Sequence, residues 1–216
     1  SAQGQSFTAN SALCSGWTSS EVLQSRWGSD YAANMQRLQS LAARTGQTVL
    51  LYNGQPAAAC YHAISSGHTE ASQNVWGGQL PYLCGVDSAW DKFADGYEVT
   101  IQYSAEQVRT ALEELGLTPD DSPESWVGAS TWDKAGYVRT LELCGQMVSG
   151  LEVRKALDLR STCFAIAWRG GQFVITTRGY GHGVGLSQYG AKAMAEGGAG
   201  WEDILEYYFP GTEIAS

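Results

Sequence analysis

The segment from residue 65 to residue 70 holds the densest group of side chains that could do chemistry. It reads Ser-Ser-Gly-His-Thr-Glu, and the aromatic residues Tyr61, Trp76 and Tyr82 lie close to it in sequence. An apolar surrounding raises the pKa of a carboxyl group, and an acid that stays protonated can protonate the leaving oxygen of a glycosidic bond. We therefore expect carbohydrate chemistry, with Glu70 as the candidate catalytic acid. The expected substrate contacts in this segment are Ser65, Ser66, His68 and Thr69.

The presence of a single candidate carboxyl group limits which type of glycosidic cleavage is possible. A glycoside hydrolase normally uses two carboxyl groups at a defined separation. A lytic transglycosylase can work with one, which first protonates the glycosidic oxygen and then accepts a proton from the 6-hydroxyl of the same sugar as that hydroxyl attacks the anomeric carbon. An anhydro-sugar forms and no water is consumed. Glu70 suits the second scheme better than the first.

A glycine-rich loop at residues 179–190 is the second functional candidate. Glycines at 179, 181, 183 and 185 alternate with larger residues, so the backbone can adopt positive φ angles and approach a ligand closely. Loops between rigid elements often carry function, but glycine-rich turns also serve packing alone, and a serine here could simply cap a helix. Both interpretations stay open. The candidate sugar contacts in the loop are Tyr180, His182, Ser187, Gln188 and Tyr189.

Other types of site fit the sequence less well. A dinucleotide fingerprint needs a third glycine, but Leu186 stands three residues after Gly183, and no Lys-Ser/Thr pair marks a phosphate loop. No G-x-S-x-G pattern surrounds Ser65 or Ser187, which argues against a hydrolase triad. Cys60, His62, His68 and Cys84 have the chemistry of zinc ligands, but their spacing matches no compact ligand pattern. We expect no metal or other cofactor.

Charge and composition limit the partners. The formal net charge is -9, from 22 acidic and 13 basic residues, and no basic run is present, so we expect no binding of nucleic acid. Eight Trp and eleven Tyr can fill a core, and some can line a groove for sugars. No apolar run is long enough to span a bilayer, so any membrane anchor is expected to lie outside this chain. The five cysteines form no C-x-x-C motif and leave at least one thiol unpaired.

Local patterns predict an α+β fold, in which antiparallel β-hairpins pack with several short helices around a glycan groove. We expect residues 1–28 to form an irregular N-terminal arm and residues 29–216 to form one domain, with a subdivision near the loop or linker 117–136. The loops 65–70 and 179–190 should converge on the groove. The other expected elements are a helix over 29–46, a hairpin at Asn53-Gly54, a strand over 97–103, capping boxes at Ser104/Gln107 and Ser149/Glu152, hairpins over 138–148 and 163–177, a helix after Ser187 and a helix ending at Pro210.

Several motifs resemble the stage II sporulation protein D family. The longest is the run Arg178-Gly-Tyr-Gly-His-Gly-Val-Gly-Leu-Ser-Gln-Tyr-Gly-Ala191, and the resemblance extends from about Thr45 to Thr212. The other matching segments are Ser65 to Glu70, Val75-Trp76, Pro81-Tyr82-Leu83, Leu157 to Phe164, Met194-Ala195, Gly198, Ile204-Leu205 and Tyr207 to Thr212.

This resemblance implies lytic transglycosylase activity on peptidoglycan glycan strands, in sporulation and cell-wall remodelling, outside the cytoplasmic membrane at the cell envelope. One departure matters. The family's catalytic glutamate lies in an upstream Glu-Met-Pro segment, which this sequence lacks. Some members also resemble zinc proteins with two Cys and two His, but only Cys14 is present in the corresponding stretch. Two alternatives therefore stand beside catalysis, namely a glycan-binding module or fragment without activity, and an amidase-enhancing protein that binds a cell-wall amidase.

Overall fold

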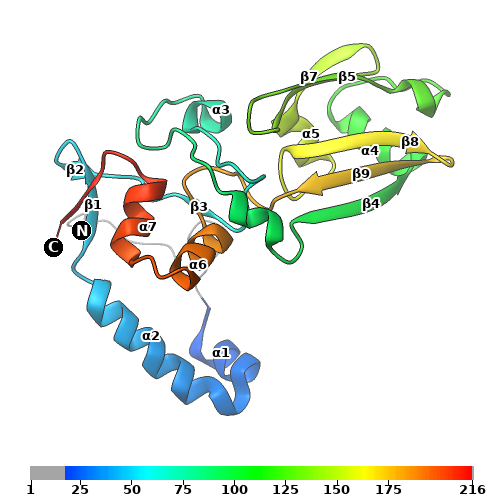
Figure 1. Ribbon diagram of the computed structural model, residues 1–216. Coiled ribbons are helices and arrows are strands. Elements are labelled where there is room, and N and C mark those ends of the chain that lie inside the picture. The colour runs from blue at the N-terminus through cyan, green and yellow to red at the C-terminus, as the bar shows by residue number, and fades with distance from the viewer. Residues whose placement is uncertain (1–17, 216) are drawn as a thin grey trace, which may run out of the picture. The chain divides into compact units, whose positions relative to one another are not determined.

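The computed structural model describes residues 18–215, which form two compact units that divide after Val49 (Figure 1). The first unit contains helix α1 (Ser20–Trp27), a 3-10 turn η1 (Gly28–Asp30) and helix α2 (Tyr31–Thr45). Helix α2 confirms the expectation for 29–46, although none of its residues is buried. Helix α1 falls within the segment 1–28 that we expected to be irregular. Ser19 caps it by accepting a hydrogen bond from the N–H of Val22. Residues 1–17 lie outside the described part.

The larger core of the second unit, residues 50–215, is built on two antiparallel three-stranded sheets. One sheet has the order β4-β9-β8, from Glu98–Ser104, Gln172–Arg178 and Cys163–Arg169. The other has the order β5-β6-β7, from Val127–Trp132, Val138–Leu143 and Gln146–Ser149. Helices α4 (Ala105–Glu114) and α5 (Gly150–Ala156) supply apolar residues to the core that these sheets enclose. The α+β class predicted from the sequence is confirmed.

Strand β5 and the short turn η3 (Pro123–Ser125) lie inside the segment 117–136, which we expected to be a loop or linker. Trp126 is fully buried in this segment and stacks on Phe173 of β9, with 5.7 Å between ring centroids. The prolines and acids at the start of the segment obscured the strand that follows. The two compact units divide after Val49.

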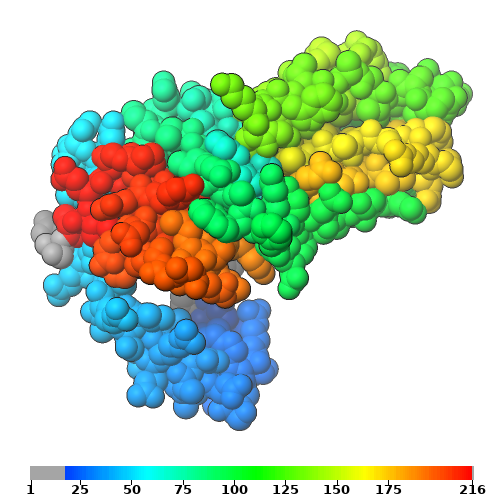
Figure 2. Space-filling model, viewed as in Figure 1, coloured from blue at the N-terminus to red at the C-terminus, as the bar shows by residue number. Residues whose placement is uncertain are grey.

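A second apolar core in the same unit joins distant parts of the chain. It includes Tyr82, Val184, Ile204 and Tyr208, and residues from the β1 segment pack against it. Figure 2 shows the C-terminal helix in red beside residues near 50–80 in cyan. The remaining elements are β1 (Val49–Tyr52), β2 (Gln55–Pro56), β3 (Tyr61–His62), α3 (Ser72–Trp76), the 3-10 helix η2 (Ala89–Phe93), β10 (Leu186–Ser187), α6 (Gln188–Glu196), α7 (Trp201–Tyr208) and β11 (Glu213–Ala215).

Local sequence signals account for several element boundaries. Both predicted capping boxes form. The hydroxyls of Ser104 and Ser149 each accept a hydrogen bond from the backbone N–H three residues later, and the side chain of that later residue accepts one from the backbone N–H of the serine. The Asn53-Gly54 hairpin forms between β1 and β2, which pair antiparallel, although β2 is only two residues long. Among residues 18–215, no helix combines the length and the apolar character needed to span a membrane.

Candidate functional site

The two segments singled out in the sequence lie side by side. Strands β3 and β10 pair in parallel, with Leu186 opposite Tyr61, and a further bridge joins Glu70 to Val184. The backbone N–H of Glu70 donates to the carbonyl of Gly183 at 2.7 Å. The expected convergence of 65–70 and 179–190 is therefore present, and it is made by main-chain hydrogen bonds.

The alternating glycines make this close approach sterically feasible. Gly181 has φ +118°, and an added Cβ there would lie 2.7 Å from the Cβ of His62. Gly185 has φ +74°, and its added Cβ would lie 2.2 Å from the carbonyl oxygen of Cys60. These glycines are thus needed both for backbone conformation and for space. In this structure they bring the backbone close to another segment of the chain.

Glu70 is held by three hydrogen-bond donors. Its Oε1 accepts from the N–H of Ala71 at 2.7 Å and from the side-chain amide of Asn74 at 2.8 Å. Its Oε2 accepts from a guanidinium nitrogen of Arg139 at 2.7 Å. Because only 4% of Glu70 is exposed, the carboxyl group has one well-defined position.

The same nitrogen of Arg139 also contacts the carboxylate of Asp133. One positive charge is therefore shared between two carboxyl groups. Burial, the largest cause, and the neighbouring Asp133 raise the pKa of Glu70 to about 7, whereas the hydrogen bonds from Asn74 and Ala71 lower it. Glu70 can consequently carry a proton near neutral pH, although its immediate neighbours are the polar Asn74, Asp133 and Arg139 rather than the apolar surrounding expected from the sequence.

Two surface hollows share Glu70. One has a volume of about 80 Å³, and Val138, Ser149 and Leu151 are among the residues that line it. The other, of about 300 Å³, extends past His68 towards Lys134. Asn74 also lines both hollows. The buried carboxyl of Glu70 and the amide of Asn74 are thus shared by the two recesses.

His182 lies under an exposed aromatic ring close to this site. Its ring centroid is 5.1 Å from that of Trp76, which is 51% exposed. The Nδ1 of His182 accepts a hydrogen bond from the N–H of Val184 at 3.0 Å, so this nitrogen is unprotonated. Burial, followed by repulsion from Arg154, lowers the pKa of His182. His182 is therefore a neutral ring that supports Trp76.

His62 lies behind His182, with 5.8 Å between the ring centroids. Its Nδ1–H donates to the carbonyl of Val184 at 3.2 Å, and its buried Nε2 has no partner among the described residues. Burial is the main reason that the pKa of His62 falls to about 4. His68 is half-buried in the larger hollow and donates from Nδ1 to the carbonyl of Thr69 at 2.7 Å.

Several of the predicted contact residues are buried and bond within the protein. Ser65 and Ser187 have no exposed surface, and both donate their hydroxyls to the carboxylate of Asp91, which is itself fully buried. Ser187 also caps α6. Ser66 donates to the carbonyl of Ala135, and the hydroxyl of Thr69 accepts from the N–H of Val86. In this conformation these four hydroxyls hold the two motif segments in place.

The remaining predicted contacts lie in three different surroundings. Tyr180 is half exposed, and the guanidinium of Arg160 stacks over its ring at 4.4 Å. Gln188 lines an apolar hollow with Tyr61 and Phe209. Tyr189 faces a third hollow with Trp90. The structure thus brings Glu70 and His68 into one recess, with His182 beside it under Trp76, and places Gln188 and Tyr189 elsewhere.

Sequence comparison identifies relatives over most of the chain, although no protein-family model matches it. Stage II sporulation protein D of Bacillus subtilis (strain 168) is 36% identical over 200 residues, which make up 92% of this chain and 57% of that protein. The protein of the same name from Bacillus amyloliquefaciens gives the same values. The amidase enhancer of Bacillus subtilis (strain 168) is 27% identical over 80% of this chain and 32% of that protein.

The chain belongs to the stage II sporulation protein D family. It spans a little over half the length of the two sporulation proteins that it matches. The motif resemblance noted in the sequence is therefore confirmed, because the match covers both motif segments and nearly all of the chain.

The four candidate zinc ligands do not gather in one place in this member of the stage II sporulation protein D family. Among residues 18–215, no cluster of three or more His, Cys, Asp or Glu side chains could hold a metal ion, so Cys60, His62, His68 and Cys84 do not form such a set. All four cysteines in the described range are free thiols. Cys14, the fifth, lies outside that range.

Sequence reasoning missed Asn74, Asp91, Asp133 and Arg139. Asn74 lies four residues after Glu70, one helical turn away, and this spacing could have suggested the contact. Asp133 and Arg139 flank the start of β6, 63 or more positions from Glu70, and no local pattern connects them with it. Asp91 lies in no recognisable sequence motif, and only its complete burial in the structure indicates a structural role.

Proposed function

We propose that this domain binds peptidoglycan glycan strands across the two hollows that share Glu70, in cell-wall remodelling during sporulation, outside the cytoplasmic membrane. The observation that carries the proposal is the position of Glu70, a buried acid with a pKa of about 7 that lines both recesses. The relatives named stage II sporulation protein D support the sporulation context. A sugar polymer has the elongated shape and the hydroxyl groups that suit such a polar recess.

Trp76 supplies an aromatic surface for the bound strand. The face of a sugar ring is apolar, so it packs well on an exposed indole, and half of Trp76 is accessible. The ring of His182 contacts the indole at 5.1 Å between centroids, and burial lowers the pKa of His182, which favours the neutral ring. Asn74, from the same short helix, lines both hollows. Its amide and the guanidinium of Arg139 provide donors for sugar oxygens.

Glu70 is the proposed acid for strand cleavage. In the lytic scheme, the Glu70 proton moves to the glycosidic oxygen as the bond from that oxygen to the anomeric carbon breaks. The 6-hydroxyl oxygen of the same muramic acid then bonds to the anomeric carbon, and its proton returns to Glu70. The acid is regenerated, and an anhydro-sugar end is formed without water. Arg139 and Asn74 stabilise the carboxylate between these two proton transfers.

Two alternatives remain alongside cleavage. The chain lacks a Glu-Met-Pro segment, which favours a domain that binds glycan without cleaving it. The amidase enhancer among the relatives supports a second role, in which the domain binds a cell-wall amidase. Both alternatives keep the cell wall as the place of action but remove the proton transfer at Glu70.

Product analysis distinguishes these functions. The chain is incubated with purified glycan strands freed of stem peptides, and the soluble products are analysed by mass spectrometry. Anhydromuramic ends made by the parent and lost in Glu70→Gln, but retained in the exposed-site control Glu113→Gln, would establish cleavage by Glu70. Binding of strands without products would leave only the binding function. A parent chain that neither binds nor cleaves strands would refute the proposal, and co-purification with an amidase would then be tested.

A further inference from the structure

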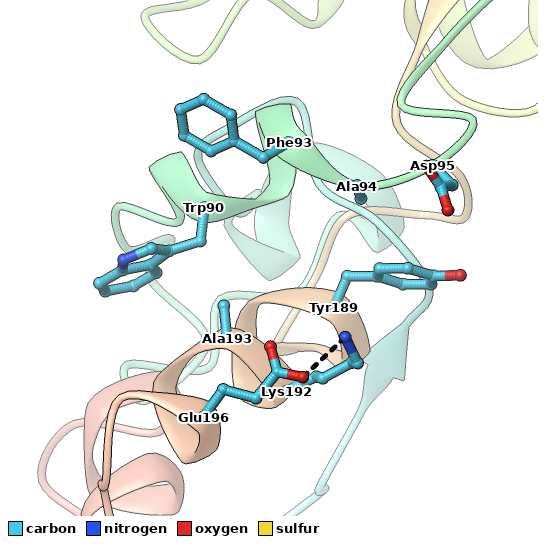
Figure 3. Close-up of a pocket in the computed structure, with 8 residues that line it drawn as sticks. All are labelled: Trp90, Phe93, Ala94, Asp95, Tyr189, Lys192, Ala193 and Glu196. Carbon is cyan, nitrogen blue, oxygen red and sulfur yellow. Dashed lines mark ion pairs between the residues drawn. The ribbon is translucent and has the colours of Figure 1, made fainter.

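A third hollow, apart from Glu70, lies between the 3-10 helix η2 and helix α6 (Figure 3). Its volume is about 200 Å³. Trp90 and Phe93 project from η2, while Tyr189, Lys192 and Glu196 project from α6, and Lys192 and Glu196 form an ion pair at 2.9 Å on one side. Asp95 completes the wall beyond the end of η2. Only Tyr189 of these residues was expected from the sequence to contact a ligand.

Buried contacts fix the position of η2 against α6. The carboxylate of Asp91, in the middle of η2, binds Ser65 and Ser187 and is fully buried. The hydroxyl of Ser88 lies 2.7 Å from that of Tyr208. Gly190 allows this approach, since a Cβ at this position would lie 2.4 Å from the Ser88 hydroxyl. The two sides of the hollow therefore form a rigid frame.

The aromatic rings on this frame contribute little to the core. Phe93 is 89% exposed, although it belongs to η2 and lies two residues after the fully buried Asp91. Trp90 and Tyr189 are each 41% exposed, and Trp90 packs edge-on against Tyr207 at 6.0 Å. Because Phe93 gains almost no burial, folding alone gives no reason for a large apolar side chain there. A ligand that stacks on flat rings would provide one.

Charged side chains around the rings indicate the type of ligand. Asp95, Lys192 and Glu196 place carboxylate acceptors and an ammonium donor within the same hollow. A purely apolar peptide or lipid would remove water from these charged groups without offering them hydrogen bonds. Sugars combine an apolar ring face with peripheral hydroxyl groups that both donate and accept hydrogen bonds. Rings and charges together therefore match a saccharide better than an apolar ligand.

We infer that this hollow is a second saccharide-binding site, which stacks one or two sugar units of an N-acetylated glycan on Trp90, Phe93 and Tyr189. This inference rests on the proposed function, because both sites would bind the same class of polymer. The Asp91 bridge connects the two regions, since η2 is bonded through Ser65 to the segment that ends at Glu70. A domain with two such sites would hold one strand at two places, or two strands at once.

The test is a titration of the isotope-labelled chain with N-acetylglucosamine hexamer, followed by NMR of the backbone amides. We expect signals of Phe93, Lys192 and Glu196 to shift with saturation. Trp90→Ala and Phe93→Ala should each weaken binding at these signals about tenfold, which corresponds to about 1.4 kcal/mol. Trp132→Ala is the matched control, because Trp132 is a 56% exposed tryptophan that lines none of these hollows. It should bind like the parent.

The outcomes separate this inference from the proposed function. Shifts confined to residues around Glu70 and Asn74, with none around Phe93, would overturn the second site and leave the proposed function standing. Parental affinity at the η2 signals in both aromatic variants would overturn it as well. If no signal shifts with the hexamer or with peptide-free glycan strands, the proposed function fails, and the second site fails with it.

Discussion

The backbone N–H of Glu70 donates to the carbonyl of Gly183 at 2.7 Å, so the candidate acid is positioned by the glycine-rich loop itself. Gly183 has φ +81°, and an added Cβ would lie 2.7 Å from the hydroxyl of Tyr137 and 3.3 Å from the Cβ of Glu70. The loop and Glu70 therefore form one structural unit, and a substitution at Gly183 should change the position of the Glu70 carboxyl group.

Gly183→Ala should lower the free energy of unfolding by about 3 kcal/mol, because it adds backbone strain and a contact with a fully buried tyrosine. Gly170→Ala is the control. Gly170 also has positive φ, +59°, but nothing lies within 4 Å of its added Cβ, so strain alone should cost on the order of 1 kcal/mol. Urea unfolding of both variants measures the difference, and equal losses would contradict a steric role of Gly183.

Asp91→Ala should destabilise the protein by about 3–5 kcal/mol, because two buried serine hydroxyls and the N–H of Ser65 lose their acceptor. Thermal unfolding measures this effect. Asp91→Asn, which keeps the shape and one acceptor oxygen, should lose less. A decrease within 0.5 kcal/mol for the alanine variant, as is usual for surface substitutions, would show that the network is not important for stability.

The pH dependence of stability should contain two opposite contributions. Glu70 has its pKa raised from 4.5 to about 7, so its contribution is fully present below pH 4.5 and is lost as pH rises through 7. His62 has its pKa lowered from 6.5 to about 4, so its contribution is fully present above pH 6.5 and is lost as pH falls through 4. Between about pH 4.5 and 6.5 the two slopes oppose each other.

We therefore expect the free energy of unfolding of the unsubstituted protein to change little between about pH 4.5 and 6.5. Urea unfolding at several pH values measures this dependence. Glu70→Gln removes the first contribution, so its stability should fall steeply as pH is lowered from 6.5 to 4.5. His62→Gln should show the reverse, with stability falling as pH rises from 4.5 to 7. Identical profiles for the parent and both variants would mean that neither group titrates abnormally.

Trp76→Ala should weaken binding of peptide-free glycan strands about fivefold to tenfold, because the exposed indole over His182 supplies the proposed stacking surface. Its stability should change little, since half of the side chain is already exposed. Calorimetric titration gives the affinity. Trp132→Ala is again the matched control, and an equal loss of affinity in both variants would argue against a specific platform.

Local signals predicted much of the fold. The capping residues Ser104 and Ser149 and the turn at Asn53-Gly54 act through neighbours in sequence, so their elements were found. Strand β5 was missed because its six residues follow a stretch rich in proline and acids, and only tertiary pairing with β6 defines it. Helix α1 was missed within a polar segment, where its Ser19 cap is the main signal.

The candidate site was only partly predictable. The composition of 65–70 indicated Glu70, and the alternating glycines indicated a close approach, but the sequence could not say what they approach. Asp133 and Arg139, which set the charge around Glu70, come from a different sheet and are connected to it only by the folded chain. The same applies to Asp91, because the burial of a carboxylate between two serines leaves no pattern in the sequence.

The pairing of β3 with β10 also determines when the site can form. His62 and Val184, whose contact belongs to this pairing, are 122 positions apart in the chain. Such long-range pairing is slow, because the entropy of closing a long loop is lost before native contacts compensate for it. During synthesis, Glu70 leaves the ribosome long before its glycine partner does. The nascent chain therefore cannot form the pairing that positions Glu70 until the glycine-rich loop at residues 179–190 has been synthesised.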